Sequence, residues 1–343
     1  MSISPNSKFF VTGGTGLVGS HFLFELAKNH KVKSLTRDIR RSQQAKDLFE
    51  YYDPENAEDL WKNVEWIEGD LEDIPLLENC LQDIDYVVHA AAFVSFRRRD
   101  FNTLLKINFE GTRNLINVCL NAQIKKFVHI SSVSVFSKTL DGSPIKESNR
   151  WKNDPDNSGY GTSKYLAERE AWRGMEEGLH GIIVNPSIIF GPGNPNESSN
   201  RLFVNVLREG KYYPPGANAF VDVRDVVDAS LMLLNSDQNK IQYILNAENL
   251  SYQSIFTQIA QAAQKRPPVK AISRSTIRFV YFIETFLKLF GRKQKLTREN
   301  VRSMFKVSKF DGSKILSDTP FEYRNMHETI LNSLNYFKSR KLL

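Results

Sequence analysis

The chain has 343 residues, of which 41% are hydrophobic and 25% charged, and its formal net charge is +7. These values are ordinary for a globular protein and allow one large core or two unequal ones. No apolar stretch reaches the roughly 18–20 residues that cross a bilayer, and the N-terminus lacks a signal-peptide pattern. The basic clusters at 97–99 and 292–295 accompany no groove-reading motif. We interpret them as solvated faces or anion contacts and expect no nucleic-acid partner.

The chain contains only two cysteines, Cys80 and Cys119, in apparently helical contexts far apart in the sequence. This usage indicates reduced, buried thiols rather than a disulfide framework. We therefore expect a cytoplasmic protein, and no metal site is predicted.

Short apolar runs alternate with helical patterns through the first two thirds of the chain. Strands separated by helices predict an α/β fold with a doubly wound, Rossmann-type parallel sheet. Such sheets bind ligands beyond the carboxyl ends of their strands. The predicted strands are 9–12, 32–36, 64–68, 86–90, 127–131, 182–185 and 243–246, and the main helices are 20–27, 102–121 and 160–177.

The first strand leads directly into the sequence TGGTGLVG at 12–19, which opens the first helix. A glycine turn into a helix aims backbone N–H groups and the positive end of the helix dipole at one point, which suits a pyrophosphate. Gly13 permits the turn, Gly16 lets phosphate approach and Gly19 lets the helix pack closely. A tight structural turn is the alternative. The predicted contacts in this turn are Gly13, Thr15, Gly16, Leu17, Val18 and Gly19.

The end of the second strand bears on which dinucleotide is bound. A site selective for NAD places a carboxylate there for the adenosine ribose, but this chain has Thr36 followed by Arg37. A guanidinium can pair with a 2′-phosphate, so NADP(H) is favoured. Asp38 keeps NAD(H) possible, because a shift of register would make it the ribose acceptor.

Tyr160 and Lys164 lie four residues apart at the start of a predicted helix, so their side chains share one face. A free phenol has a pKa of about 10, and a neighbouring ammonium is expected to lower it. A phenol with such a pKa could exchange a proton with a carbonyl or alcohol oxygen. An exposed tyrosine and a solvated lysine are the structural alternative.

With these motifs in order, the chain resembles the extended branch of the short-chain dehydrogenase/reductase superfamily, the NAD-dependent epimerases and dehydratases. The turn at 12–19 matches the extended TGxxGxxG form, and Gly69-Asp70-Leu71 resembles the adenine contact. His89-Ala90-Ala91-Ala92 stands where the family has a cofactor-lining stretch. The segment 131–136 resembles the SSxxVY signature.

The resemblance implies roles for individual residues. Tyr160 would be the general acid/base, Ser132 would bind the substrate oxygen, and Lys164 would hold the nicotinamide ribose. Asn108 would support a water that links Lys164 to solvent. The segment from 185 to 193 resembles the stretch beside the nicotinamide ring. Besides Tyr160 and Lys164, the cofactor contacts implied beyond the first turn are Arg37, Asp70, Leu71, Ala90, Ala91, Ala92, Pro186 and Ser187.

The rhythm of the sequence changes after residue 190. We expect a dinucleotide-binding domain at 1–190, a substrate-binding lobe over most of 191–343, and a strand near 221–246 that returns to the first domain. The form AFVDVRDVVDA at 219–229 resembles the dihydroflavonol-reductase and 3β-hydroxysteroid-dehydrogenase groups. Sugar-nucleotide members usually carry an arginine where this chain has Ala219, although Arg201 and Arg208 are possible substitutes.

These features favour an NADP(H)-dependent oxidoreductase that interconverts a carbonyl and a secondary alcohol on an apolar or mixed small molecule. A nucleotide-sugar epimerase or dehydratase that recycles NAD is the alternative, and a non-catalytic dinucleotide-binding regulator is the third. Family resemblance implies a homodimer through the helices 102–121 and 160–177. The stretch 309–316 resembles the FDxSK segment near the end of reductase-like members and suggests a complete chain.

A strongly apolar, aromatic-rich helix is predicted at 276–290. It could cover the core of the smaller lobe, close over an apolar substrate, or rest on a membrane surface. Covering the core is the commonest role of such a helix, so membrane contact is not the favoured expectation.

Overall fold

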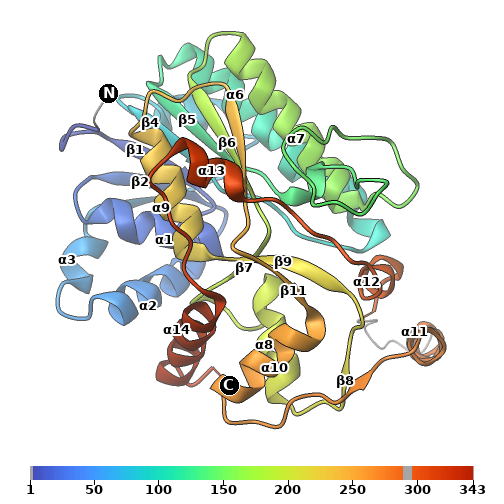
Figure 1. Ribbon diagram of the computed structural model, residues 1–343. Helices are drawn as coiled ribbons and strands as arrows, with labels where there is room; N and C mark the ends of the chain where they lie inside the picture. The colour runs from blue at the N-terminus through green and yellow to red at the C-terminus, as the bar shows by residue number, and fades with distance from the viewer. Residues whose placement is uncertain (1–2, 289–295, 343) are drawn as a thin grey trace.

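A computed structural model describes residues 3–288 and 296–342 (Figure 1). Its centre is a parallel sheet with strand order β10-β6-β5-β4-β1-β2-β3. All seven predicted strands are present, and their ends differ from the prediction by at most two residues. The strands are β1 (Phe9–Thr12), β2 (Val32–Thr36), β3 (Val64–Glu68), β4 (Tyr86–His89), β5 (Lys126–Ile130), β6 (Gly181–Pro186) and β10 (Ile241–Leu245).

Helices cover both faces of this sheet, which explains why its strands read as continuous apolar runs. Phe9 and Val11 point into the core on one face, while Phe10 points into the core on the other. The first face is covered by α1 (Leu17–Ala27), α2 (Gln43–Tyr52), α3 (Ala57–Trp61) and α9 (Val223–Leu234). The second is covered by α4 (Ile74–Cys80), α6 (Gly111–Asn121) and α7 (Gly159–Glu176).

The helix predicted over 102–121 is not a uniform α-helix. It consists of α5 (Phe101–Leu104), a π-helical segment (Leu105–Glu110) and α6. Asn108 lies in the wide segment and is buried. Its side-chain oxygen accepts from the Phe93 N–H at 2.7 Å, and its amide nitrogen donates to the Phe93 carbonyl at 3.0 Å. The wide turns thus place one polar side chain against the loop after β4, as such segments often do at functional sites.

A second core lies below the central sheet in the view of Figure 1. It is built on the three-stranded sheet β11-β9-β7, in which β9 is parallel to β7 and antiparallel to β11. Its elements are β7 (Ile188–Phe190), α8 (Arg201–Leu207), β9 (Ala217–Asp222), β11 (Glu248–Ser251), α10 (Tyr252–Ala262) and α14 (Met326–Ser339). Between β9 and β11 the chain returns to the central sheet as α9 and β10. The division into domains at residue 190 stays a prediction.

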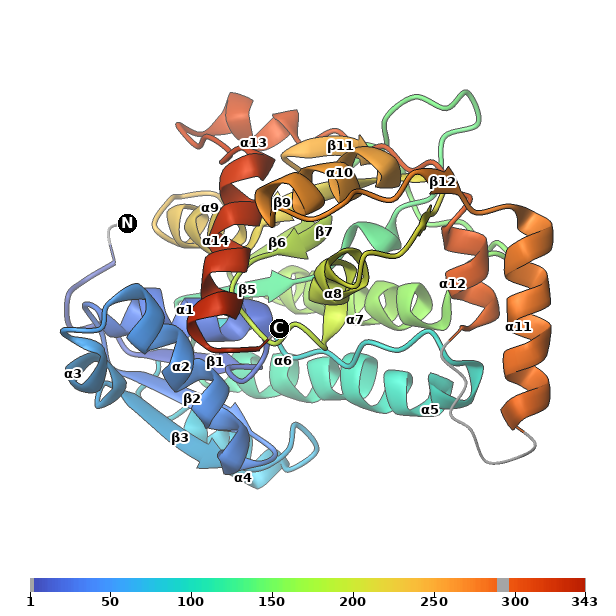
Figure 2. The same cartoon turned by 90° about the horizontal axis from the view of Figure 1, so that it is seen from below.

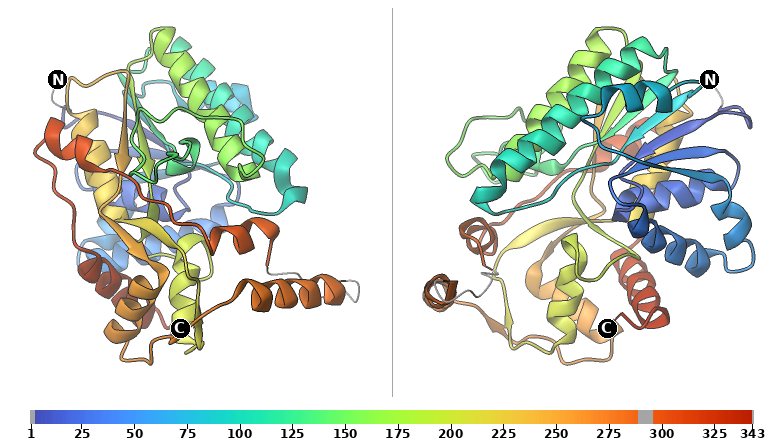
Figure 3. Two further views of the ribbon diagram at one scale, coloured as in Figure 1. Left: turned by 45° about the vertical axis from the view of Figure 1, so that its right-hand side comes forward. Right: turned by 180° about the vertical axis from the view of Figure 1, so that it is seen from behind.

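The remaining elements lie at the periphery. A short parallel pair joins β8 (Tyr212–Tyr213) to β12 (Lys270–Ala271). They are followed by α11 (Arg274–Lys288), α12 (Arg298–Ser303) and α13 (Ser313–Asp318). Figure 3 shows α11 projecting from the body of the molecule.

The expectations for the two cysteines and the two basic clusters can be compared with this fold. Cys80 and Cys119 are free and buried, as predicted. Residues 97–99 are exposed, which agrees with a solvated face. The cluster at 292–295 lies outside the described residues.

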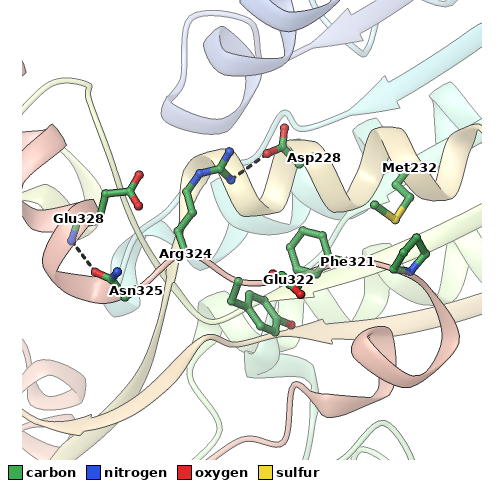
Figure 4. A pocket seen from close by; sticks show the side chains of 9 residues that line it. Asp228, Met232, Phe321, Glu322, Arg324, Asn325 and Glu328 are labelled. Carbon is green, nitrogen blue, oxygen red and sulfur yellow. Dashed lines mark hydrogen bonds and ion pairs between the residues drawn. The ribbon is translucent and has the colours of Figure 1, made fainter.

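A surface depression lies between α9 and the segment that precedes α14 (Figure 4). Arg324 spans it and pairs with Asp225 at 2.7 Å and with Asp228 at 2.8 Å. None of the predicted site residues lines this depression. We interpret it as a structural tie between α9 and α14.

Candidate active site

The turn after β1 has the geometry that a dinucleotide requires. Gly13 has a φ of +77°, and a Cβ placed there would lie 2.6 Å from the Ala91 backbone nitrogen. A Cβ at Gly19 would lie 2.1 Å from the Gly13 carbonyl oxygen, so α1 can approach β1 this closely only with glycine. The N-cap of α1 is Gly16, and within the described residues no side chain caps the first turn. Its N–H groups therefore suit a pyrophosphate.

The turn also lies at the correct place in the sheet. β1 pairs with β4 on one side and with β2 on the other, and the strand order reverses between β1 and β4. Ligands of open α/β sheets bind at this switch point, outside the carboxyl ends of the strands. The predicted residues Thr15, Leu17 and Val18 belong to the same turn and first helical turn.

The two candidate contacts for the adenosine ribose, Arg37 and Asp38 at the end of β2, have different surroundings. Arg37 is exposed and directly follows the strand. The Asp38 carboxylate instead binds the Arg40 guanidinium through two hydrogen bonds of 2.8 and 2.9 Å. Pairing with Arg40 lowers the pKa of Asp38. Because both carboxylate oxygens already accept from Arg40, Asp38 is a poor acceptor for a ribose hydroxyl.

Other predicted contacts follow the neighbouring strands at the same edge of the sheet. Asp70 follows β3, and its carboxylate accepts from the Glu72 N–H at 3.2 Å. Ala91 follows β4 and donates its N–H to the Thr12 hydroxyl at 3.2 Å. Ser187 follows β6, and its hydroxyl is buried without a hydrogen-bond partner among the described residues. The remaining contacts flank these positions: Leu71 is buried, Ala90 is half-buried, Ala92 is exposed and Pro186 ends β6.

Three of the four predicted catalytic side chains, those other than Asn108, lie just beyond the carboxyl end of β5. Ser132 begins the short helix η4 (Val133–Val135), and Tyr160 lies in the first turn of α7, whose N-terminus Ser158 caps at 2.9 Å. The Ser132 side chain lies close enough to the Tyr160 hydroxyl to lower the pKa of the phenol. Lys164 is buried one turn later and donates to the Ile130 carbonyl at 2.7 Å. This bond anchors the lysine to the carboxyl end of β5.

The expected acidification of the phenol is not what the structure gives. Burial raises the pKa of Tyr160 to about 12, and the nearby Ser132 side chain offsets this only in part. Burial likewise lowers the pKa of Lys164 to about 8, opposed by the carboxylate of Glu168. The sequence prediction was wrong here because spacing along a helix does not show how much water surrounds two side chains. A phenol with a raised pKa is protonated at neutral pH.

A chain of hydrogen bonds connects the nucleotide turn to the catalytic helix. His89 bonds Thr12 at 2.7 Å through Nδ1 and Thr112 at 2.8 Å through Nε2. Thr112 donates to the Asn108 carbonyl, and the Asn108 amide donates to the Ser163 hydroxyl at 2.9 Å. Thr112 must therefore accept from Nε2–H, which assigns the His89 tautomer. Burial lowers the pKa of His89 to about 3, so this link is neutral.

Asn108 thus acts on two elements. Its side chain holds the loop after β4 through Phe93 and contacts α7 through Ser163. The predicted water relay through Asn108 stays a prediction. The contacts in hand make this residue a positioning group between the cofactor-lining loop and the helix of Tyr160.

Two acidic residues of the site were not predicted. Glu168 lies one turn beyond Lys164 and is buried, and it accepts from Ser131 at 2.6 Å and from Asn185 at 2.7 Å. The one sequence signal for Glu168 was its position four residues after Lys164, one turn further along the same helix. Glu299 on α12 accepts from the Gly159 N–H at 3.4 Å, next to Tyr160. No local pattern could have revealed a contact between residues 140 positions apart.

A family model for NAD dependent epimerases and dehydratases matches residues 9–247, which include the turn and all three converging side chains. The chain belongs to the NAD dependent epimerase/dehydratase family. Membership of this family, the extended short-chain dehydrogenases/reductases, identifies an enzyme that depends on a nicotinamide dinucleotide.

Individual members of the epimerase/dehydratase family resemble the chain over much of its length. A putative dihydroflavonol 4-reductase of Synechocystis sp. is 27% identical, over 96% of this chain and 94% of the relative. Tetraketide alpha-pyrone reductase 2 of Arabidopsis thaliana is 31% identical, over 66% of this chain and 74% of the relative. The fold is shared with a dTDP-glucose 4,6-dehydratase from Streptomyces venezuelae solved with NAD, at a TM-score of 0.74 and 18% identity, over 97% and 98% of the two chains.

Proposed function

We propose that this chain reduces a carbonyl compound to a secondary alcohol with NADPH, with Tyr160 as the proton donor. The dinucleotide supplies the hydride when bound. The observation that carries the proposal is the placement of Tyr160, in the first turn of α7, beside Ser132, which begins η4 just beyond the carboxyl end of β5. Tyr160 protonates the oxygen as negative charge develops there, and Ser132 stabilises that charge by hydrogen bonding.

The two remaining members of the predicted catalytic group support these roles. Lys164 is held by Ile130 in a buried position, where it would bind the ribose hydroxyls of the nicotinamide half. Asn108 fixes the relative placement of α7 and the loop after β4. Both therefore act by orienting the bound dinucleotide against the carbonyl carbon.

We favour NADP(H) over NAD(H) because of the charges at the end of β2. The Asp38 carboxylate is neutralised by Arg40. Arg37 forms no ion pair with another residue of the described ranges and is exposed beside the strand end. A guanidinium in that position can bind a 2′-phosphate, whereas a neutralised carboxylate neither repels the phosphate nor serves a ribose hydroxyl well.

We favour an apolar or mixed substrate over a nucleotide sugar. Ala219 is fully buried and packs with Ile145, Ile244 and Phe310, so this position of β9 lies inside a core. An arginine for a substrate diphosphate is therefore lacking at this position. The relatives from Synechocystis sp. and Arabidopsis thaliana described above are named as reductases, which agrees with this choice.

The test is the consumption of NADPH at 340 nm with panels of ketones and aldehydes. We expect turnover that falls about 10²- to 10⁴-fold in Tyr160→Phe, the range that general acid catalysis contributes. Tyr165→Phe, on the same helix, is the matched control and should retain activity. Interconversion of nucleotide sugars with retained NAD and no net absorbance change would show an epimerase instead. Dinucleotide binding without turnover on either panel would show a regulator.

We also expect a homodimer in which α6 and α7 of two copies form a four-helix contact. Sedimentation velocity measures the mass directly. A monomer at micromolar concentration would contradict this assignment without affecting the proposed chemistry.

A further inference from the structure

The helix α11 presents apolar side chains to solvent. Phe279 and Phe282 are 65% and 68% exposed, and Ile283 is 40% exposed. Phe286, at the next position of the same helical spacing, is exposed as well. The intervals of three and four residues place these side chains on one face. Contiguous exposed apolar side chains of this size mark interaction sites on soluble proteins.

The opposite face of α11 is the one turned toward the protein. Ile277 is buried, and Glu284 accepts from the Leu296 N–H at 2.8 Å. The helix is therefore amphipathic, but it is oriented differently from most surface helices, because its aromatic face points away from the body of the protein. Figure 2 shows α11 at the edge of the molecule with α12 between it and the rest of the chain. The expectation that this helix covers the core of the smaller lobe is wrong for its aromatic face.

A lid over the active site does not fit the same arrangement. The element that reaches the catalytic helix is α12, through the contact of Glu299 with Gly159. The aromatic side chains of α11 are exposed, so they do not pack against α12 or the catalytic helix. A flat surface can reach the whole length of α11 because the helix projects from the body (Figure 3).

The charge of the chain is concentrated around this helix. Residues 270–306 contain ten Lys or Arg and two Asp or Glu, whereas the other 306 residues contain 36 and 37. The whole net positive charge of the protein therefore resides in this stretch. On α11 itself, Arg274 and Arg278 are exposed, and Arg278 adjoins the aromatic face. Exposed arginines beside an exposed aromatic face repel a second copy of the same face and attract an anionic surface.

We propose that the outward face of α11, formed by Phe279, Phe282 and Ile283 and flanked by Arg278, docks on an anionic lipid surface. Aromatic side chains enter the boundary between headgroups and acyl chains, while Arg278 contacts lipid phosphates and Arg274, which stacks on Phe305, adds positive charge nearby. Among the described residues no helix is both long and apolar enough to cross a membrane, so the attachment is peripheral. It brings the enzyme to a phase in which apolar carbonyl compounds are concentrated.

Vesicle flotation of the full chain tests the proposal. We expect binding to phosphatidylcholine vesicles that contain about 30% phosphatidylglycerol, and much weaker binding to phosphatidylcholine alone. The double substitution Phe279→Ser and Phe282→Ser should lower binding about tenfold or more. The double substitution Ile74→Ser and Leu331→Ser is the matched control. These apolar side chains lie on other helices, where Ile74 is 42% and Leu331 is 36% exposed. This control should bind as the unchanged protein does.

The charge contribution is tested separately. Arg274→Gln with Arg278→Gln should weaken binding to the anionic vesicles but not to neutral ones. Raising the salt from 0.1 M to 1 M shortens the Debye length from about 10 Å to about 3 Å and should also weaken binding. A thermal midpoint within about 2 °C of the unchanged protein shows that the variants are folded.

Three results would overturn the proposal. The first is absence of binding by the unchanged chain to the anionic vesicles. The second is equal binding by the aromatic double variant and its control. The third is loss of self-association or a raised KM in the aromatic variant without any change in vesicle binding, which would show a protein contact or a lid. The vesicle-binding and self-association measurements do not depend on the proposed reaction, whereas the KM comparison requires measured turnover.

Discussion

Substitution of Gly13 by alanine offers a measurement of what the nucleotide turn demands. A left-handed φ costs a non-glycine residue about 1–2 kcal/mol. Gly13 has a φ of +77°, and its added Cβ would also lie 2.6 Å and 2.7 Å from backbone atoms of Ala91 and Ala90. Overpacking of this kind costs about 1–3 kcal/mol more. Gly142 has a φ of +75° but nothing within 4 Å of such a Cβ, so Gly142→Ala carries the first cost alone.

We therefore expect Gly13→Ala to be less stable than Gly142→Ala by about 1–3 kcal/mol. Denaturant unfolding measures this difference, and a change of 2 kcal/mol corresponds to roughly 3 °C in thermal midpoint for a chain of this length. Gly13→Ala should also bind NADPH at least about tenfold more weakly, because relief of the contact moves the loop after β4. Equal stability and equal NADPH affinity in the two variants would refute the role given to the turn.

Three further predictions concern charge at the site. Arg37→Ala should weaken NADPH binding about 10- to 100-fold and NADH binding little, since a charge-assisted hydrogen bond contributes about 1.5–3 kcal/mol. Arg41→Ala, whose side chain pairs with Glu197, is the control, and equal losses for both dinucleotides in Arg37→Ala would remove the cofactor argument. Reductase activity should fall as the pH rises through about 8, because Lys164 then loses its proton. A flat profile from pH 7 to about 9.5 would show that the ammonium is not required. Glu168→Gln should move this fall to lower pH, since the carboxylate raises the pKa of Lys164, whereas Glu170→Gln should leave the profile in place.

Much of the site could be predicted from sequence because its residues follow strands whose positions are themselves predictable. A strand buried on both faces needs a continuous apolar run, and polar residues directly after it fall at one edge of a parallel sheet. Ser132 and the turn at Gly13 follow strands in this way, whereas Tyr160 was identified from its spacing to Lys164 and from the family resemblance. Spacing along the sequence could not predict contacts between residues that are distant in the sequence. Glu299 reaches the catalytic helix from the C-terminal segment, and the partners of Asn108 come from a loop and a second helix.

The order of apolar runs and glycines determined the parallel sheet and its nucleotide turn, since these depend on periodicity and on backbone freedom that each residue carries with it. The ordered motifs at 12–19, 131–136 and 160–164 indicated the family by resemblance. Tertiary structure alone decided the protonation of Tyr160 and the outward direction of the aromatic face of α11. These properties depend on which groups exclude water from a side chain or bind it, and most of those groups are distant in the sequence.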